Sequence, residues 1–142
     1  MSNNSNLANA ISKYESYTSE ELKKEFFRVV KSGNIVLCDA LLHKGVDVDT
    51  KDEHGMTGLH WAAKNIRPLM VSFLIQRGAD PNVICDQTLE TPVTIAAREN
   101  NVPILHYLIE HGGNEFYCDS RNVNILCYAV SNGSALTTEY LV

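Results

Sequence analysis

Apolar residues recur along this chain with a fixed step of 33 or 34 residues. A pair of large apolar residues precedes a glycine three times: Leu41-Leu42 before Gly45, Leu74-Ile75 before Gly78, and Leu108-Ile109 before Gly112. Smaller apolar pairs keep the same step: Val29-Val30, Ala62-Ala63, Ala96-Ala97 and Ala129-Val130. A step of this length, repeated in four registers, is typical of a solenoid built from one supersecondary unit.

Each unit is predicted to contain two short helices and an extended finger. Thr57 precedes one helix, where its hydroxyl can accept hydrogen bonds from free backbone amides, and Pro92 is expected at the first helical position of the next unit. Pro68 and Pro103 open the second helices in the same way. The glycine after each apolar pair ends the second helix. The predicted units cover residues 18–50, 51–83, 84–117 and 118–142.

The two ends of the chain differ in pattern. Thr18 stands three residues before Glu21, which is the spacing of a capping box, so a helix is expected from this point with Lys23 and Lys24 on its outer face. Residues 1–17 are rich in Ser and Asn and are predicted to be a flexible leader. The fourth unit ends at Val142 inside its second helix, which predicts a fragment of a longer protein.

Composition narrows the class of protein. Hydrophobic residues make up 44% and charged residues 20%, as in soluble globular domains. The net charge of -5 and the absence of a basic run argue against nucleic-acid binding. The apolar runs are too short to span a membrane, and the N-terminus lacks the features of a signal peptide. The four cysteines (Cys38, Cys85, Cys118, Cys127) are therefore expected to be reduced thiols.

The sequence gives no sign of catalysis, of a metal or of a cofactor. It contains no H-E-x-x-H, no G-x-S-x-G and no phosphate-binding loop. Cys85 and Cys118 occupy equivalent places in adjacent units, so neither a disulfide nor a metal pair is expected. His60 is interpreted as a structural hydrogen-bonding residue. The acidic finger lacks the EF-hand spacing and is expected to be a solvated edge, formed by Asp47, Asp49, Asp52 and Glu53.

At the level of motifs the sequence resembles the ankyrin-repeat family. The resemblance covers about residues 18–142, and its matching residues are Asp52, Gly55, Thr57, Leu59, His60, Ala62, Ala63, Leu74, Gly78, Ala79, Asp80 and Asn82. The T-P-L-H motif of the family appears as Thr57-Gly58-Leu59-His60, as Thr91-Pro92-Val93-Thr94, and as Asn124-Ile125-Leu126-Cys127. The resemblance implies an all-α solenoid of about four helix-loop-helix units. Only the second unit keeps the Thr and His that bond across loops, so a looser C-terminal end is expected.

In an ankyrin-like unit the residue after the His points to the concave side of the stack. Through the register, this slot holds Arg28, Trp61, Ile95 and Tyr128. The slot three residues later holds Lys31, Lys64, Arg98 and Ser131, and the next one holds Ser32, Asn65, Glu99 and Asn132. The predicted peptide-binding groove therefore consists of Trp61, Lys64, Asn65, Ile95, Arg98 and Tyr128.

The expected ligand of this groove is a protein segment in extended conformation. A Trp at the centre of such a groove suits a binding hot spot, and Asn65 can hydrogen-bond a peptide backbone. The alternative is that Trp61 only packs flat between neighbouring helices. The chain is expected to act as a monomer.

A narrower resemblance is carried by "TGLHWA", by a longer finger ending "LETP", and by "NIL" at the start of the fourth unit. These segments are similar to the ankyrin region of the Akr-type and huntingtin-interacting Asp-His-His-Cys S-palmitoyltransferases. In that family a groove Asn and Trp are associated with gripping substrate peptides. Asn65 matches the Asn, whereas the Trp position of the family falls at Ile95 and Trp61 matches another Trp one unit earlier.

Two functions follow from these patterns. The chain is either a non-catalytic module that recruits substrate peptides for a membrane palmitoyltransferase, or a stand-alone ankyrin scaffold or regulatory adaptor without enzymatic context. The first implies a cytosol-facing arm of an integral membrane protein of the Golgi or other endomembranes. The chain itself contains no Asp-His-His-Cys sequence.

Overall fold

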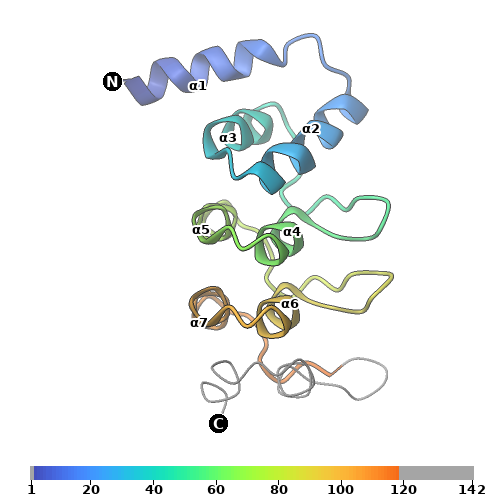
Figure 1. Ribbon diagram of the computed structural model, residues 1–142. Helices are drawn as coiled ribbons and strands as arrows, with labels where there is room; N and C mark the ends of the chain where they lie inside the picture. Colours follow the sequence, from blue (N-terminus) through green and yellow to red (C-terminus); the bar gives the residue numbers. More distant parts are fainter. Residues whose placement is uncertain (1, 119–142) are drawn as a thin grey trace.

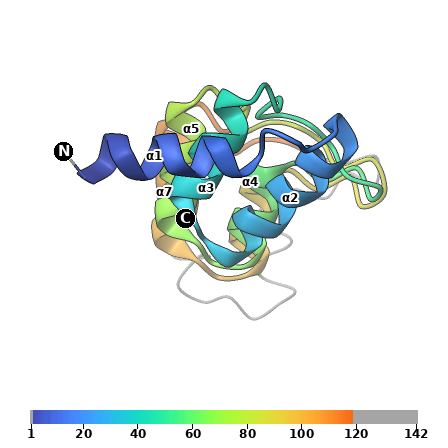
Figure 2. The same ribbon diagram turned by 90° about the horizontal axis from the view of Figure 1, so that it is seen from above.

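The computed structural model of the protein describes residues 2–118, which form seven helices and no strand. The helices are α1 (Ser2–Lys13), α2 (Ser19–Ser32), α3 (Ile35–His43), α4 (Gly58–Lys64), α5 (Pro68–Gln76), α6 (Pro92–Arg98) and α7 (Val102–Glu110). The pairs α2/α3, α4/α5 and α6/α7 stack in one column, and the fingers project from the same side (Figure 1). Seen from above, α3, α5 and α7 lie over one another (Figure 2). The predicted all-α solenoid is confirmed.

The helix boundaries follow from the capping residues. Thr18 and Glu21 form the predicted capping box, with the Glu21 amide donating to Thr18 Oγ1 at 3.2 Å and the Thr18 amide donating to Glu21 Oε1 at 3.3 Å. Thr57 caps α4 in the same manner. Helix α5 begins at Pro68, and α7 begins at Val102, one residue before the predicted Pro103. Gly78 has a φ of 91°, which residues other than glycine rarely adopt, and it follows the end of α5 as expected.

The core runs without interruption from one helix pair to the next. Leu59, Leu74 and Leu108 are each 0% exposed, as predicted, whereas Leu126 lies outside the described residues. The alanine pairs of α4 and α6 are also fully buried. Because an alanine adds only a methyl group to the helix surface, it lets neighbouring helices approach closely. The predicted repeat of small apolar residues is therefore the packing surface between units.

Residues 1–17 do not form the flexible leader that their composition predicted. Residues from Ser2 onward form α1, which lies across the N-terminal end of the stack and packs against α3 (Figures 1 and 2). Ala10 is 7% exposed and Tyr14 is 0% exposed, and Leu7 and Ile11 pack beside them. These four residues follow the i, i+3, i+4, i+7 spacing of an amphipathic helix. The abundant Ser and Asn obscured this narrow apolar stripe.

Tyr14 also ties α1 to α2. Its hydroxyl donates to Glu25 Oε2 at 3.2 Å, and Glu25 forms an ion pair with Arg28. Burial, followed by the Glu25 carboxylate, raises the pKa of Tyr14 to about 12. The phenol is therefore a neutral donor over the whole physiological pH range.

The fingers are joined by a ladder of side-chain to backbone hydrogen bonds. The Asp80 amide donates to Asp49 Oδ1 at 3.1 Å, and one unit later the Asn114 amide donates to Asn82 Oδ1 at 2.7 Å. Asp49 was expected to belong to a solvated acidic edge, but its carboxylate links two units instead. The ladder uses Asp and Asn, whose short side chains accept hydrogen bonds from the backbone of the next finger.

His60 is buried and links the second unit to the third. Its Nδ1 accepts from the Thr57 amide at 3.0 Å, and its Nε2 lies 3.0 Å from the Glu90 carbonyl oxygen. This pairing requires the neutral tautomer with its proton on Nε2. Thr94 occupies the equivalent place in the third unit and bonds only within its own turn, to the amide and the carbonyl of Thr91. The expected structural role of His60 is confirmed.

Replacing Leu74 by Ala should lower the free energy of unfolding by about 2–5 kcal/mol, since Leu74 is fully buried and the packed site cannot collapse. Leu69→Ala is the matched control: Leu69 is 73% exposed, and its change should stay within about 0.5 kcal/mol. Urea denaturation followed by circular dichroism measures both. Equal losses in the two variants would contradict the assignment of the interior.

The stability of the chain should fall at mildly acidic pH because of His60. Burial lowers the pKa of His60 below its ordinary value, whereas the unfolded chain binds the proton near pH 6.5. The unfolded state therefore holds more protons below that pH, and the free energy of unfolding decreases as the pH falls from about 6.5 towards the folded pKa.

The variant His60→Gln isolates this effect, because glutamine does not titrate. Unfolding free energies measured at intervals from pH 7 to pH 5 should fall more steeply for the unmodified chain than for the variant. Parallel curves would show that His60 does not exchange its proton in this way.

Candidate functional site

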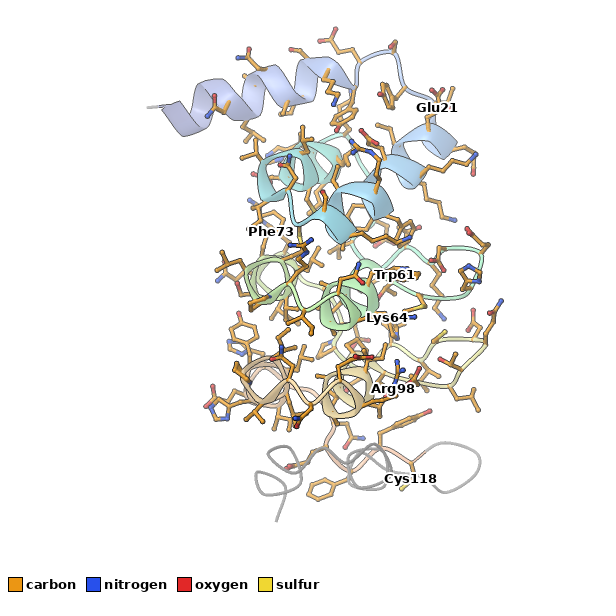
Figure 3. All side chains as sticks on the ribbon, in the orientation of Figure 1. Glu21, Trp61, Lys64, Phe73, Arg98 and Cys118 are labelled. Carbon is orange, nitrogen blue, oxygen red and sulfur yellow. The ribbon has the colours of Figure 1, made fainter. Side chains whose placement is uncertain are left out.

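Within the described residues, the predicted groove consists of Trp61 and Lys64 on α4, Asn65 at the C-terminal end of α4, and Ile95 and Arg98 on α6. We call the surface formed by Lys31, Trp61, Lys64, Asn65 and Arg98 the inner face. Trp61, Lys64 and Arg98 lie on the finger side of α4 and α6 (Figure 3). Tyr128, the remaining member of the predicted groove, lies outside the described residues.

Trp61 is partly buried against the core and partly open on the inner face. Its indole Nε1–H donates to Asp52 Oδ2 at 2.7 Å. The ammonium of Lys31 stands 4.0 Å from the ring centroid and that of Lys64 stands 5.2 Å from it. Trp61 was interpreted either as a groove residue or as a residue that only packs between helices. The structure agrees with each in part, since the ring packs on its neighbours and also forms part of the surface.

Asp52 fixes the orientation of the indole. Its second oxygen accepts the amides of His54 and Met56 at 2.9 and 3.0 Å. Burial acts to raise the pKa of Asp52, but the hydrogen bonds from Met56, Trp61 and His54 outweigh it, and the pKa lies below its ordinary value. The carboxylate is ionised at neutral pH. Its hydrogen bonds hold the first finger, which is the loop that joins α3 to α4, against α4.

Ile95 was predicted to continue the apolar stripe, and this prediction is wrong. Its side chain is 1% exposed and belongs to the core. The register is correct, since Ile95 follows Trp61 by one repeat, but an isoleucine is much shorter than a tryptophan and is enclosed at a slot where the indole reaches the surface. The inner face therefore has a single aromatic contact within the described residues.

Arg98 lies on the inner face, but its charge is already compensated. Its Nε stands 2.8 Å from Glu90 Oε2, and its Nη1 stands 3.5 Å from Glu99 Oε1. Lys64 and Asn65 are exposed, and neither makes an ion pair or a side-chain hydrogen bond within residues 2–118. These two remain available for a ligand, whereas Arg98 would first have to leave Glu90.

A cavity of about 350 Å³ adjoins the inner face between α2 and the first finger. Its lining residues are Glu20, Lys23, Lys24, Phe27, Lys31, Asp52 and Glu53. Lys31 and Asp52 also contact Trp61, so the cavity and the inner face form one continuous surface. Sequence reasoning placed Lys23 and Lys24 on the outer face and did not include them in the groove. The spacing of Lys24, Arg28 and Lys31 along α2, at i, i+4 and i+7, is the signal that could have joined them to it.

No cluster of three or more His, Cys, Asp or Glu side chains that could hold a metal occurs within residues 2–118. Cys38 is buried, and burial raises the pKa of its thiol to about 12, which makes it a poor nucleophile. No helix of this part of the chain is long and apolar enough to cross a bilayer. The arrangement is suited to binding through aromatic, ammonium and amide groups.

The sequence model described as "Ankyrin repeats (3 copies)" matches residues 26–85 and 67–142, most of the chain. Palmitoyltransferase AKR1 of Lachancea kluyveri is 27% identical over 127 residues, 87% of this chain and 17% of the relative. Palmitoyltransferase akr1 of Neurospora crassa is 32% identical over 117 residues, 82% of this chain and 16% of the relative.

A different class of relative is equally similar. The inactive serine/threonine-protein kinase TEX14 of Bos taurus is 33% identical over 123 residues, 87% of this chain and 8% of the relative. The chain thus spans less than a fifth of the length of each of these curated relatives.

Proposed function

The chain belongs to the ankyrin-repeat family, and from this we propose that it recruits an extended peptide of a partner protein through its inner face. Ankyrin repeats are protein–protein interaction modules that are non-catalytic by themselves. We propose that the chain binds this extended ligand as a monomer. The first residues to test are Trp61, Lys64 and Asn65.

The half-open indole of Trp61 is the observation that supports this proposal best. The core requires no aromatic residue at this slot, since the equivalent Ile95 fits entirely inside. A tryptophan held in place by Asp52 loses little conformational freedom when a ligand side chain stacks on it. Tryptophan is also among the residues enriched at binding hot spots.

Asn65 supports the same use of the surface. It ends α4 and is exposed one residue after Lys64. A side-chain amide offers two donors and one acceptor, so it can satisfy both polar groups of a peptide unit in an extended ligand. Such pairing replaces the water that the ligand backbone loses on binding.

We propose further that the module serves a membrane protein S-palmitoyltransferase as a substrate-recruiting arm. The two fungal palmitoyltransferases match more than four fifths of the chain, which supports this context. The arm would face the cytosol, on an integral membrane protein of the Golgi or other endomembranes. Sequencing the transcript past Val142 tests this: a multi-pass membrane domain with an Asp-His-His-Cys box is expected, and an open reading frame without either contradicts the context.

The second candidate is a stand-alone scaffold or regulatory adaptor. The 33% identity to an inactive kinase supports a context without enzymatic activity, because that similarity covers as much of the chain as the similarity to the palmitoyltransferases. Both candidates use the same inner face. They differ only in the enzymatic context, which the transcript settles.

Replacing Trp61 by Ala should weaken peptide binding by on the order of 2 kcal/mol, because the stacking surface is removed. The probe is a peptide selected on the purified chain from a displayed random library and then synthesised, and calorimetry measures its affinity. Asn65→Ala should also weaken binding, and this exposed position puts the fold at little risk.

Leu69→Ala is the control, since it removes an exposed apolar side chain from the start of α5 instead of the inner face. Its affinity should match that of the unmodified chain. Circular dichroism verifies that each variant is folded. If Trp61→Ala and Asn65→Ala both bind as well as the control, the inner face is not the binding surface.

A further inference from the structure

Several basic side chains of the described residues are already paired: Lys51 pairs with Asp86 at 2.9 Å, and Arg77 pairs with Asp39 at 2.8 Å. Away from the cavity, Lys13, Lys44 and Arg67 form no ion pair within residues 2–118. Four lysines around the cavity and the inner face have no ion-pair partner within residues 2–118: Lys23, Lys24, Lys31 and Lys64. We call these four the lysine cluster. Its charges are left unpaired on a chain whose net charge is -5.

We propose that the lysine cluster binds an acidic stretch of the partner peptide, beside the segment that contacts Trp61. This inference rests on the proposed function and adds the chemistry of the ligand. Aspartate and glutamate side chains would enter the space between α2 and the first finger. The recognition is by complementary charge along an extended chain.

Trp61 brings two members of the lysine cluster together. The ammonium groups of Lys31 and Lys64 both stand over one indole, at 4.0 and 5.2 Å from its centroid. The attraction of each ammonium to the face of the ring holds two like charges near each other. A carboxylate placed beside them relieves this repulsion and gains two charge-assisted hydrogen bonds.

The cavity extends the same chemistry along α2. Lys23 and Lys24 line it together with Lys31, and Phe27, which is 6% exposed, gives it an apolar surface. The aliphatic part of a glutamate or aspartate side chain can lie on Phe27 while its carboxylate meets an ammonium group. The cavity therefore offers an acidic side chain both an apolar surface and ammonium partners.

Three acidic residues also line this cavity, as many as its lysines, but none of them is in direct contact with a lysine of the cluster as an ion pair. Asp52 is engaged with the indole and two backbone amides. Glu53 lies on the finger beside His54, 3.7 Å from its Nε2. Glu20 lies in the first turn of α2, where the helix dipole favours a negative charge. No ion pair joins any of the three to the lysine cluster within the described residues.

The sole tryptophan of the chain reports on this site directly. The probes are a synthetic glutamate-rich peptide with single valines, its counterpart with every Glu replaced by Gln, and a single-stranded DNA oligonucleotide. The glutamate peptide should shift the emission of Trp61 saturably and bind about tenfold more tightly than the glutamine peptide, because several exposed charge pairs add up. Its affinity should fall as salt is raised.

Two lysine variants form a matched pair. Lys31→Gln removes an ammonium that stacks on Trp61, and Lys13→Gln removes one that stacks on Tyr14, the residue after α1, at 5.5 Å from the ring centroid. Of these two variants, only Lys31→Gln should weaken binding of the glutamate peptide, and the double variant Lys31→Gln/Lys64→Gln should weaken binding further. Equal effects of Lys31→Gln and Lys13→Gln would overturn the proposal.

The other outcomes separate this inference from the proposed function. If the glutamine peptide binds as tightly as the glutamate peptide, the inner face binds peptides but the lysine cluster does not select acids. Tighter binding of the oligonucleotide would assign the cluster to nucleic acid and overturn the inference. If neither these peptides nor any library peptide binds, both proposals fail together.

Discussion

No helix pair of this chain can bury its own apolar side chains, and the structure depends on that constraint. Leu59, Leu74 and Leu108 are fully enclosed only because a neighbouring pair covers each of them. The alanine pairs of α4 and α6 allow this contact to be close, and the Asp and Asn ladder of the fingers holds the units in one register. The units within residues 18–117 therefore present the same slots to the same side.

The repeated slots explain how the proposed binding residues arise without a pocket built for them. A position that packing does not require to be apolar can change freely from unit to unit, and on α4 that position holds Trp61. Its neighbours on the stack, Lys31 and Lys64, come from adjacent units, so the site exists only when the units are stacked. Stability and binding thus share one origin in the contact between helix pairs.

The architecture could be predicted from the sequence because the repeat depends on spacing. Helix ends at Thr18, Thr57 and Gly78 each follow from one local rule of capping. The surface residues were harder to predict from the sequence. The burial of Ile95 depends on the length of its side chain, and the neutralisation of the Arg98 charge depends on Glu90 in the finger of the same unit. Leu89 adopts a φ of 62° where the previous unit has Gly55, and no local rule predicts that exchange.

Helix α1 closes the N-terminal end of the array. A repeat stack without such a cover leaves a packing face open at its end, to which another array could add. By covering α3, α1 closes one end with polar residues outward, so another stack of repeats could not join there without first displacing it. The end of the column that is closed to another array is thereby set by the twelve residues of α1, which lie outside the repeat.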